Sequence, residues 1–212
     1  VGAALGEVPG GWTPESEMAL KNVGFVRVSP DGNRVAYTIA EAVMTPDKSE
    51  YVTQVWIANA DGSNSYQVSF GEKSSNDPQW SPDGKWLSFT SARTGKSNLF
   101  VLRTSGGEAE QLTDVKTGIT AFGWSPDGSR IAFTMRDQAS DEEEKAAKGK
   151  DDSRWVDENV KMNRLYVVSI QKDDKGKREP RKLTTGDYTV EADFDWSSDG
   201  KAIAFSKTRM PK

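Results

Sequence analysis

The stretch Trp80-Ser-Pro-Asp-Gly-Lys-Trp-Leu-Ser-Phe89 decides how the rest of this 212-residue chain is interpreted. Proline fixes φ near −65° and suits the second position of a tight turn. Aspartate accepts hydrogen bonds from the turn backbone, and glycine supplies a positive φ. The residues that follow the turn are aromatic, branched or alternating, as they are in β-strands. The stretch therefore predicts a β-hairpin.

The same pattern occurs four times, beginning at Val28, Trp80, Trp124 and Trp196, and only the fourth copy has Ser198 in place of proline. We interpret the recurring tryptophan as a packing residue between repeated units. The aspartate and glycine of each copy are expected to be turn residues without a metal or catalytic role. These residues are Asp31, Gly32, Asp83, Gly84, Asp127, Gly128, Asp199 and Gly200.

Between successive copies lie two further short runs of strand-forming residues, so each repeat predicts four antiparallel strands. Repeats of this size and strand number are typical of β-propeller blades. The expected blades span about 24–71, 76–114, 118–186 and an incomplete 191–212, after an N-terminal arm of residues 1–23 with a short helix capped by Thr13. About three and a half blades do not close a propeller, so we expect the N-terminal part of a longer one.

Composition excludes several classes of function. The chain has no cysteine and no histidine, which excludes disulfides, Cys/His zinc sites and any Ser-His-Asp or Cys-His catalytic unit within it. Its net charge of −4 argues against nucleic-acid binding, and no apolar run is long enough to span a membrane. We expect no cofactor and no metal site.

The loops between the second and third strands of each blade are the expected binding region, because insertions on one face of a repeat fold often mark it. Two of these loops look enlarged, 41–53 and 137–163. The second holds nine acidic and five basic side chains. It is either a solvent-exposed loop without a binding role or a carboxylate cluster that holds the cationic end of a peptide.

The candidate substrate-binding residues are cations that follow the second strands and acids in the two enlarged loops. For the cations, ion pairing within the loops is the alternative role. The candidates are Arg93, Arg136, Arg209, Glu41, Glu142, Glu143 and Glu144.

The repeats resemble those of TolB-like periplasmic propellers and of the N-terminal propeller in the prolyl oligopeptidase family of serine peptidases. Several segments favour the second group, in particular its acylaminoacyl-peptidase-like and dipeptidyl-peptidase-like members. They are Trp12-Thr-Pro-Glu15 before Gly24-Phe-Val-Arg-Val-Ser-Pro-Asp-Gly32, Glu41-Ala-Val-Met44, and Leu183-Thr-Thr-Gly-Asp-Tyr188.

This resemblance implies a propeller that caps an α/β-hydrolase domain, admits short peptides and carries no catalytic residue itself. The catalytic triad would lie beyond Lys212. The implied partners are the remaining blades, the hydrolase domain and a peptide substrate, and association with further copies stays open. The alternative is a TolB-like module that only binds proteins. The family implies a periplasmic or secreted location, while a cytoplasmic one is not excluded by the residues.

Overall fold

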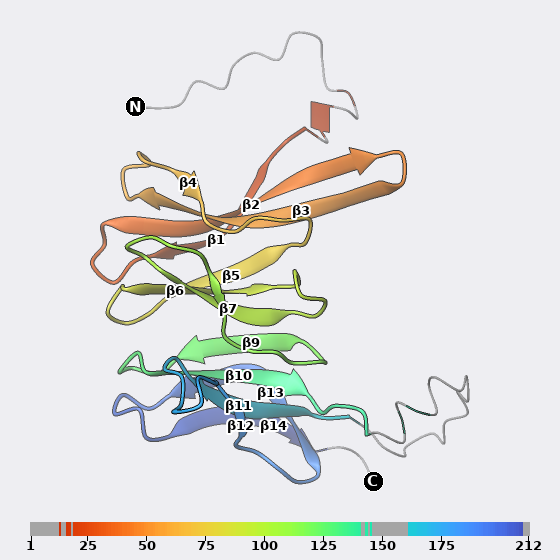
Figure 1. The fold of residues 1–212 in the computed structure, drawn as a ribbon, viewed down its shortest axis with the longest axis vertical. Coiled ribbons are helices and arrows are strands. Elements are labelled where there is room, and N and C mark those ends of the chain that lie inside the picture. The colour runs from red at the N-terminus through yellow and green to blue at the C-terminus, as the bar shows by residue number, and fades with distance from the viewer. Residues whose placement is uncertain are drawn as a thin grey trace.

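The computed structural model describes residues 13, 16–17, 19–140, 143, 145 and 161–209 (Figure 1). Within these residues, three antiparallel sheets of four strands are followed by a sheet of two strands. The strands of each sheet follow one another in chain order, so every sheet is a meander. The prediction of an all-β propeller with about three and a half blades is therefore confirmed.

The first sheet contains β1 (Asn22–Val28), β2 (Arg34–Thr45), β3 (Lys48–Asn59) and β4 (Tyr66–Gln67). The second contains β5 (Ser75–Trp80), β6 (Trp86–Ser91), β7 (Asn98–Arg103) and β8 (Glu110–Gln111). The third contains β9 (Ile119–Trp124), β10 (Arg130–Arg136), β11 (Asn163–Ser169) and β12 (Arg181–Lys182). The last contains β13 (Tyr188–Trp196) and β14 (Ile203–Arg209).

The fourth strand of each complete blade is only two residues long, although the strand-forming runs there are longer: 66–70, 110–113 and 180–184. After these strands, a hydroxyl group accepts a hydrogen bond from the third strand where a carbonyl would otherwise continue the ladder. Ser69 Oγ accepts from the N–H of Val55 at 2.8 Å, and Thr113 Oγ1 accepts from the N–H of Leu99 at 3.0 Å. The side chain satisfies the buried donor, so the backbone leaves the sheet early.

Residues 41–53 form a hairpin, so the prediction of an enlarged loop there is wrong. Pairing of β2 with β3 runs without interruption to Thr45 and Lys48, and Glu41 pairs with Val52. The two strands extend beyond β1, whose pairing with β2 reaches only Ala40 (Figure 1). Pro46-Asp47 forms the turn, and the residues on both sides alternate well enough to continue the strands.

The predicted N-terminal helix is not seen as an element of the described structure. Ser16 and Glu17 are helical, and the N–H of Ser16 donates to Thr13 Oγ1 at 3.1 Å, as in a helix N-cap. The other residues of the expected helix either lie outside the described part or are not helical.

The four repeated turns stack on one face of the molecule, here called the turn face. Each turn glycine after Gly32 lies against the proline of the preceding turn. A β-carbon on the glycine would lie 3.6–3.7 Å from the proline Cδ in the pairs Gly84–Pro30, Gly128–Pro82 and Gly200–Pro126. The second strands, β2, β6, β10 and β14, all begin at the turn face. They therefore end at the opposite face, here called the insertion face.

The tryptophans of the repeat join neighbouring blades. Each indole N–H donates to a backbone carbonyl of the preceding first strand: Trp80 to Arg27 at 3.0 Å, Trp124 to Gln79 at 3.4 Å, and Trp196 to Gly123 at 3.2 Å. The first strands β1, β5, β9 and β13 are thus held side by side. The apolar ring supplies contact area between the blades, and the directional indole hydrogen bond fixes how the two strands are aligned.

The cores lie between successive sheets. Phe89, Ile57 and Leu87 are fully buried between the first and second blades, and Phe133, Leu99 and Ile131 between the second and third. A smaller core around Val190 joins the third blade to β13 and β14.

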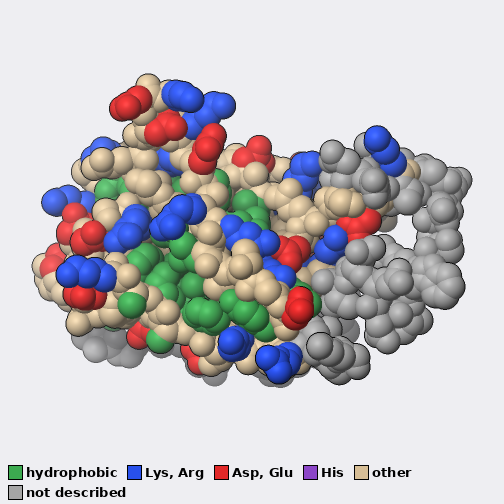
Figure 2. Space-filling view, turned by 90° about the horizontal axis from the view of Figure 1, so that it is seen from below, with side chains coloured by type: hydrophobic (Ala, Val, Ile, Leu, Met, Phe, Trp, Pro, Cys, Tyr) green, Lys and Arg blue, Asp and Glu red, His purple; other side chains and the backbone are tan. Residues whose placement is uncertain are grey.

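At the end of the stack that Figure 2 shows, apolar side chains gather on the surface. They include Leu183, Ile203 and Phe205, which line a hollow of about 180 Å³ beside β12 and β14. At the other end, Val23 and Val28 of β1 are 63% and 61% exposed. Over the described residues, no helix has the length and hydropathy needed to cross a membrane.

Candidate functional site

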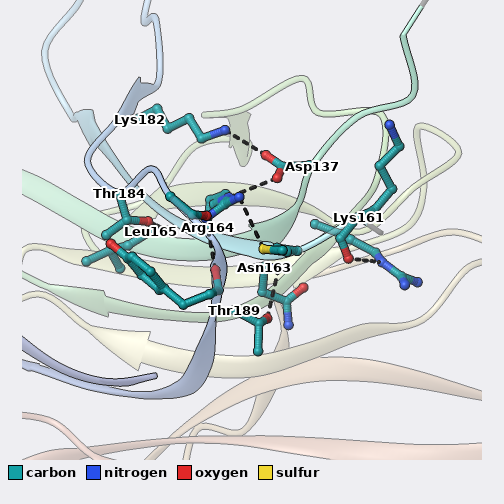
Figure 3. A network of polar contacts seen from close by, with 12 residues as sticks. Asp137, Lys161, Asn163, Arg164, Leu165, Lys182, Thr184 and Thr189 are labelled. Carbon is teal, nitrogen blue, oxygen red and sulfur yellow. Dashed lines mark hydrogen bonds and ion pairs between the residues drawn. The ribbon is translucent and has the colours of Figure 1, made fainter. Parts of the chain in front are cut away.

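A network of polar contacts on the insertion face lies where the segment after β10 leaves the third blade (Figure 3). Asp137 follows β10 directly and receives two cations. Arg164 Nε on β11 lies 2.8 Å from Asp137 Oδ2, and Lys182 Nζ on β12 lies 2.6 Å from Asp137 Oδ1. One carboxylate thus joins three successive strands at one end of the blade.

Arg164 extends this cluster to the next blade. Its Nη1 donates to the carbonyl oxygens of Gly186 and Tyr188, at 2.7 and 2.9 Å. These residues form the connection into β13, and the guanidinium also lies 5.9 Å from the Tyr188 ring centroid. The Arg164 side chain is only 9% exposed. Its planar group therefore ties the insertion-face ends of both blades together.

Two opposing effects act on the pKa of Asp137. Partial burial raises it, and the hydrogen bonds from Lys182 and Arg164, together with their charges, lower it by more. The net pKa lies below the ordinary aspartate value, so the group is ionised at neutral pH. The ionised carboxylate therefore forms ion pairs with both cations and holds β11 and β12 to the end of β10.

Arg136 and Glu143, both predicted binding residues, are connected through Lys161. Arg136 Nε donates to the backbone oxygen of Lys161 at 3.0 Å, and Lys161 Nζ lies 2.5 Å from Glu143 Oε2. The N–H of Ser140 donates to the same Glu143 oxygen, and the N–H of Glu143 donates to Ser140 Oγ. This reciprocal pattern is a capping box, and Glu143 is helical. The Lys161 hydrogen bond is the main cause of the lowered pKa of Glu143.

Arg93 lies against its own blade. Its guanidinium carbon is 4.6 Å from the ring centroid of Phe100 and 5.6 Å from that of Phe89. Nε donates to Ser91 Oγ at 3.1 Å, and Nη2 is 3.4 Å from Ser75 Oγ. Burial lowers its pKa, though an arginine stays charged. This half-buried guanidinium is a fixed cation at the insertion-face end of the second blade.

The other predicted residues lie apart from these. Glu41 is on β2 and pairs with Lys21 at 2.8 Å, and Arg209 ends β14 opposite Tyr188. Glu142 and Glu144 lie outside the described residues. No contact between described residues joins Glu41, Arg93 and Arg209 to one another; each belongs to a different blade.

Sequence reasoning did not select Asp137, Arg164 or Lys182 as site residues. One signal was available, because Arg164 opens a run of otherwise apolar residues, Leu165 to Val168. An arginine within a buried strand needs a partner, and its burial therefore indicates an ion pair. The Ser140-x-x-Glu143 spacing was a second signal.

The side chains of this face are engaged in ion pairs and hydrogen bonds within the chain. The face presents fixed cations and carbonyl acceptors, and the chain has neither histidine nor cysteine to activate a nucleophile. Among the described residues, no group of three or more acidic side chains is arranged to hold a metal ion.

Comparison with known proteins identifies a family and a set of relatives. Residues 21–158 match the family model of the TolB β-propeller domain. The chain is 32% identical over 210 residues to the uncharacterized peptidase YuxL of Bacillus subtilis, covering 92% of this chain and 31% of that protein. It is 28% identical over 214 residues to dipeptidyl-peptidase 5 of Porphyromonas gingivalis, covering 93% and 31%. The chain thus spans about a third of the length of these curated relatives.

A solved structure shares the fold. The uncomplexed acylaminoacyl peptidase of Pyrococcus horikoshii superposes with a TM-score of 0.58 at 19% identity, over 86% of this chain and 27% of that one.

Proposed function

The chain belongs to the TolB β-propeller domain family, and from this premise we propose that it is the substrate-admitting propeller portion of a serine peptidase that cleaves short peptides. In this proposal the α/β-hydrolase domain and its catalytic triad lie beyond Lys212, and the whole protein acts in the periplasm or outside the cell. The chain itself performs no bond cleavage.

Two kinds of observation support the proposal. Relatives that match more than nine-tenths of the chain are named as peptidases, and the chain accounts for only 31% of each. The Asp137 cluster is the observation from this structure that carries the gating role. It holds the start of the 137–163 segment, β11, β12 and the entry to β13 in one arrangement at the insertion face.

The proposed gating role depends on a rigid attachment of the 137–163 segment to the blade. A segment with a net negative charge selects peptides by size and terminal charge only if its base is held in place. Arg164 and Lys182 provide that base through a shared carboxylate. Arg136 and Arg93 supply the cations of the same face that would contact a peptide carbonyl or carboxylate.

The test uses the protein extended through its proposed hydrolase domain. A fluorophosphonate probe should label it, and the isolated 212-residue chain should neither be labelled nor hydrolyse a peptide. Asp137→Asn should raise kcat/KM for long peptides relative to dipeptide-length substrates while labelling is unchanged. Glu110→Gln, on the turn face, is the matched control and should leave the length preference unaltered.

Two results would reject the proposal. One is a parent protein that is not labelled and has no hydrolase domain, which would favour a TolB-like protein-binding module in accord with the family match. The other is peptide turnover by the isolated chain.

A further inference from the structure

On the turn face, an arginine clamps two of the three junctions between blades. Arg34 Nη2 donates to the carbonyl oxygen of Gly84 at 3.3 Å, and its guanidinium lies 4.9 Å from the Trp80 ring centroid. Arg130 Nη2 donates to Gly200 O at 3.0 Å and lies 5.1 Å from the Trp196 ring centroid. Both arginines occupy the second position after the turn glycine.

At the junction of the second and third blades, this position holds Trp86. An indole at this position cannot replace the guanidinium that reaches the next turn at the other two junctions. A hollow of about 480 Å³ lies beside Trp86 and is here called the Trp86 hollow. Its lining comes from both blades. It consists of Trp86, Arg103 and Glu110 from the second blade, and Gly128, Ser129, Ile170, Gln171, Lys172 and Arg178 from the third.

The charges of the Trp86 hollow do not balance. Arg103, Lys172 and Arg178 bring three positive charges, and Glu110 brings one negative charge. Glu110 Oε2 lies 3.0 Å from Arg178 Nη2 and 3.8 Å from Lys172 Nζ. The Arg178 hydrogen bond is the main cause of the lowered pKa of Glu110, so this carboxylate is already ionised and engaged. Two positive charges therefore remain in excess.

Two of the arginines that line the hollow are held by contacts within the chain. The Arg178 side chain is 11% exposed, and its Nε donates to the backbone oxygen of Ile170 at 2.8 Å. The Arg103 guanidinium lies 4.3 Å from the ring centroid of Trp86, which also lines the hollow. Gln171 and Ser129 add exposed polar side chains at the rim.

From this arrangement we infer that the Trp86 hollow binds a small dianion, either a dicarboxylate or a phosphate monoester. Its volume lies in the range of small-ligand sites. Trp86 forms an apolar wall. Arg103 and Lys172 supply the two positive charges that Glu110 leaves unbalanced, and these would pair with the two negative charges of the ligand. The site lies on the turn face, so it is separate from the proposed peptide-binding face and does not depend on the proposed function.

Isothermal titration calorimetry at constant ionic strength tests this inference, with succinate and inorganic phosphate as probes and acetate as the monoanion control. Saturable binding of at least one dianion is expected, with weaker binding of acetate. Arg103→Gln and Lys172→Gln should each weaken binding about tenfold, the loss of one charge-assisted hydrogen bond. Lys85→Gln and Lys201→Gln remove the same charge from other turns of this face and should change affinity less than about twofold.

Trp86→Arg separates a built site from general attraction to a cationic surface. The substitution adds a positive charge, so general attraction would increase. By analogy with Arg34 and Arg130, however, an arginine at this position should reach the next turn and occupy the hollow, so binding should be lost. Equal or tighter dianion binding by Trp86→Arg, or equal loss in the Lys85→Gln control, would overturn the inference. Absence of saturable binding by the parent chain would do the same.

Discussion

Asp137→Asn removes the one negative charge on which Arg164 and Lys182 converge, and it leaves the side-chain shape almost unchanged. The Arg164 and Asp137 side chains are 9% and 23% exposed, so the pair is largely screened from water. Breaking a fully buried pair typically costs about 3–5 kcal/mol. Here Arg164 keeps its bonds to the carbonyls of Gly186 and Tyr188, and the new amide oxygen still accepts one hydrogen bond. We therefore expect a loss of about 2 kcal/mol.

For a chain of this length, that loss corresponds to a fall in Tm of about 4–8 °C. Thermal unfolding followed by circular dichroism measures it. Hydrogen exchange provides a local readout at Asn163, whose N–H donates to Thr189 Oγ1 across the same junction at 3.1 Å. This amide should exchange faster in the variant.

Glu110→Gln is the matched control for this prediction. Glu110 also pairs with two cations, but its side chain is 52% exposed, and exposed pairs contribute less than about 1 kcal/mol. The reasoning is refuted if Asp137→Asn destabilises the chain no more than Glu110→Gln does. It is also refuted if stability falls as expected while exchange at Asn163 is unchanged, because the cluster would then not hold that junction.

Three further outcomes are expected. Gly128→Ala should lower the free energy of unfolding by about 1–2 kcal/mol in chemical denaturation, because φ is +67° at this position. Gly123→Ala is the control and should lower it little, because Gly123 lies in a strand and an added β-carbon would make only an ordinary contact with Phe194. Arg130→Gln should cost about 1–2 kcal/mol by the same assay through loss of the Gly200 bond and the Trp196 contact, and an unchanged midpoint would contradict the clamp. Hydrogen bonds, chiefly from Ser29 and Ser125, lower the pKa of Asp31 and Asp127 to about 2. The contribution of these carboxylates to stability is therefore full above pH about 4 and is lost as the pH falls toward 2. The free energy of unfolding, measured across this range, should fall less steeply for Asp127→Asn than for the parent chain.

The parts of the fold that could be predicted are those encoded within a few residues. The Ser-Pro-Asp-Gly turns combine three local preferences in four positions. In the structure the serine hydroxyl and the aspartate complete each turn, as Ser81 does with Asp83 at 2.6 Å. The tryptophan before three of the four turns was interpretable because a large ring at a fixed repeat position has few roles other than packing.

The 41–53 hairpin was misread because its cues conflict. Pro46, Asp47 and the charges around them are typical of a loop, yet they occupy only a two-residue turn, and the flanking residues keep the alternation of strands. Asp137, Arg164 and Lys182 were missed for a different reason. Their partners are 27 and 45 residues apart in the chain, and no local pattern encodes a pairing that only the stacking of β10, β11 and β12 creates.

The two faces of the molecule differ because their connections obey different constraints. At the turn face, three of the turn glycines lie against the proline of the preceding turn, and the aspartate of each turn accepts a hydrogen bond from the serine of the same turn, so the Ser-Pro-Asp-Gly turns themselves have no room for insertions. The ends of the second strands carry no such constraint, and the segment between β10 and β11 starts and ends there. Variation in what is bound is therefore expected at the insertion face. At the turn face it is expected only where the clamp is replaced, as it is at Trp86.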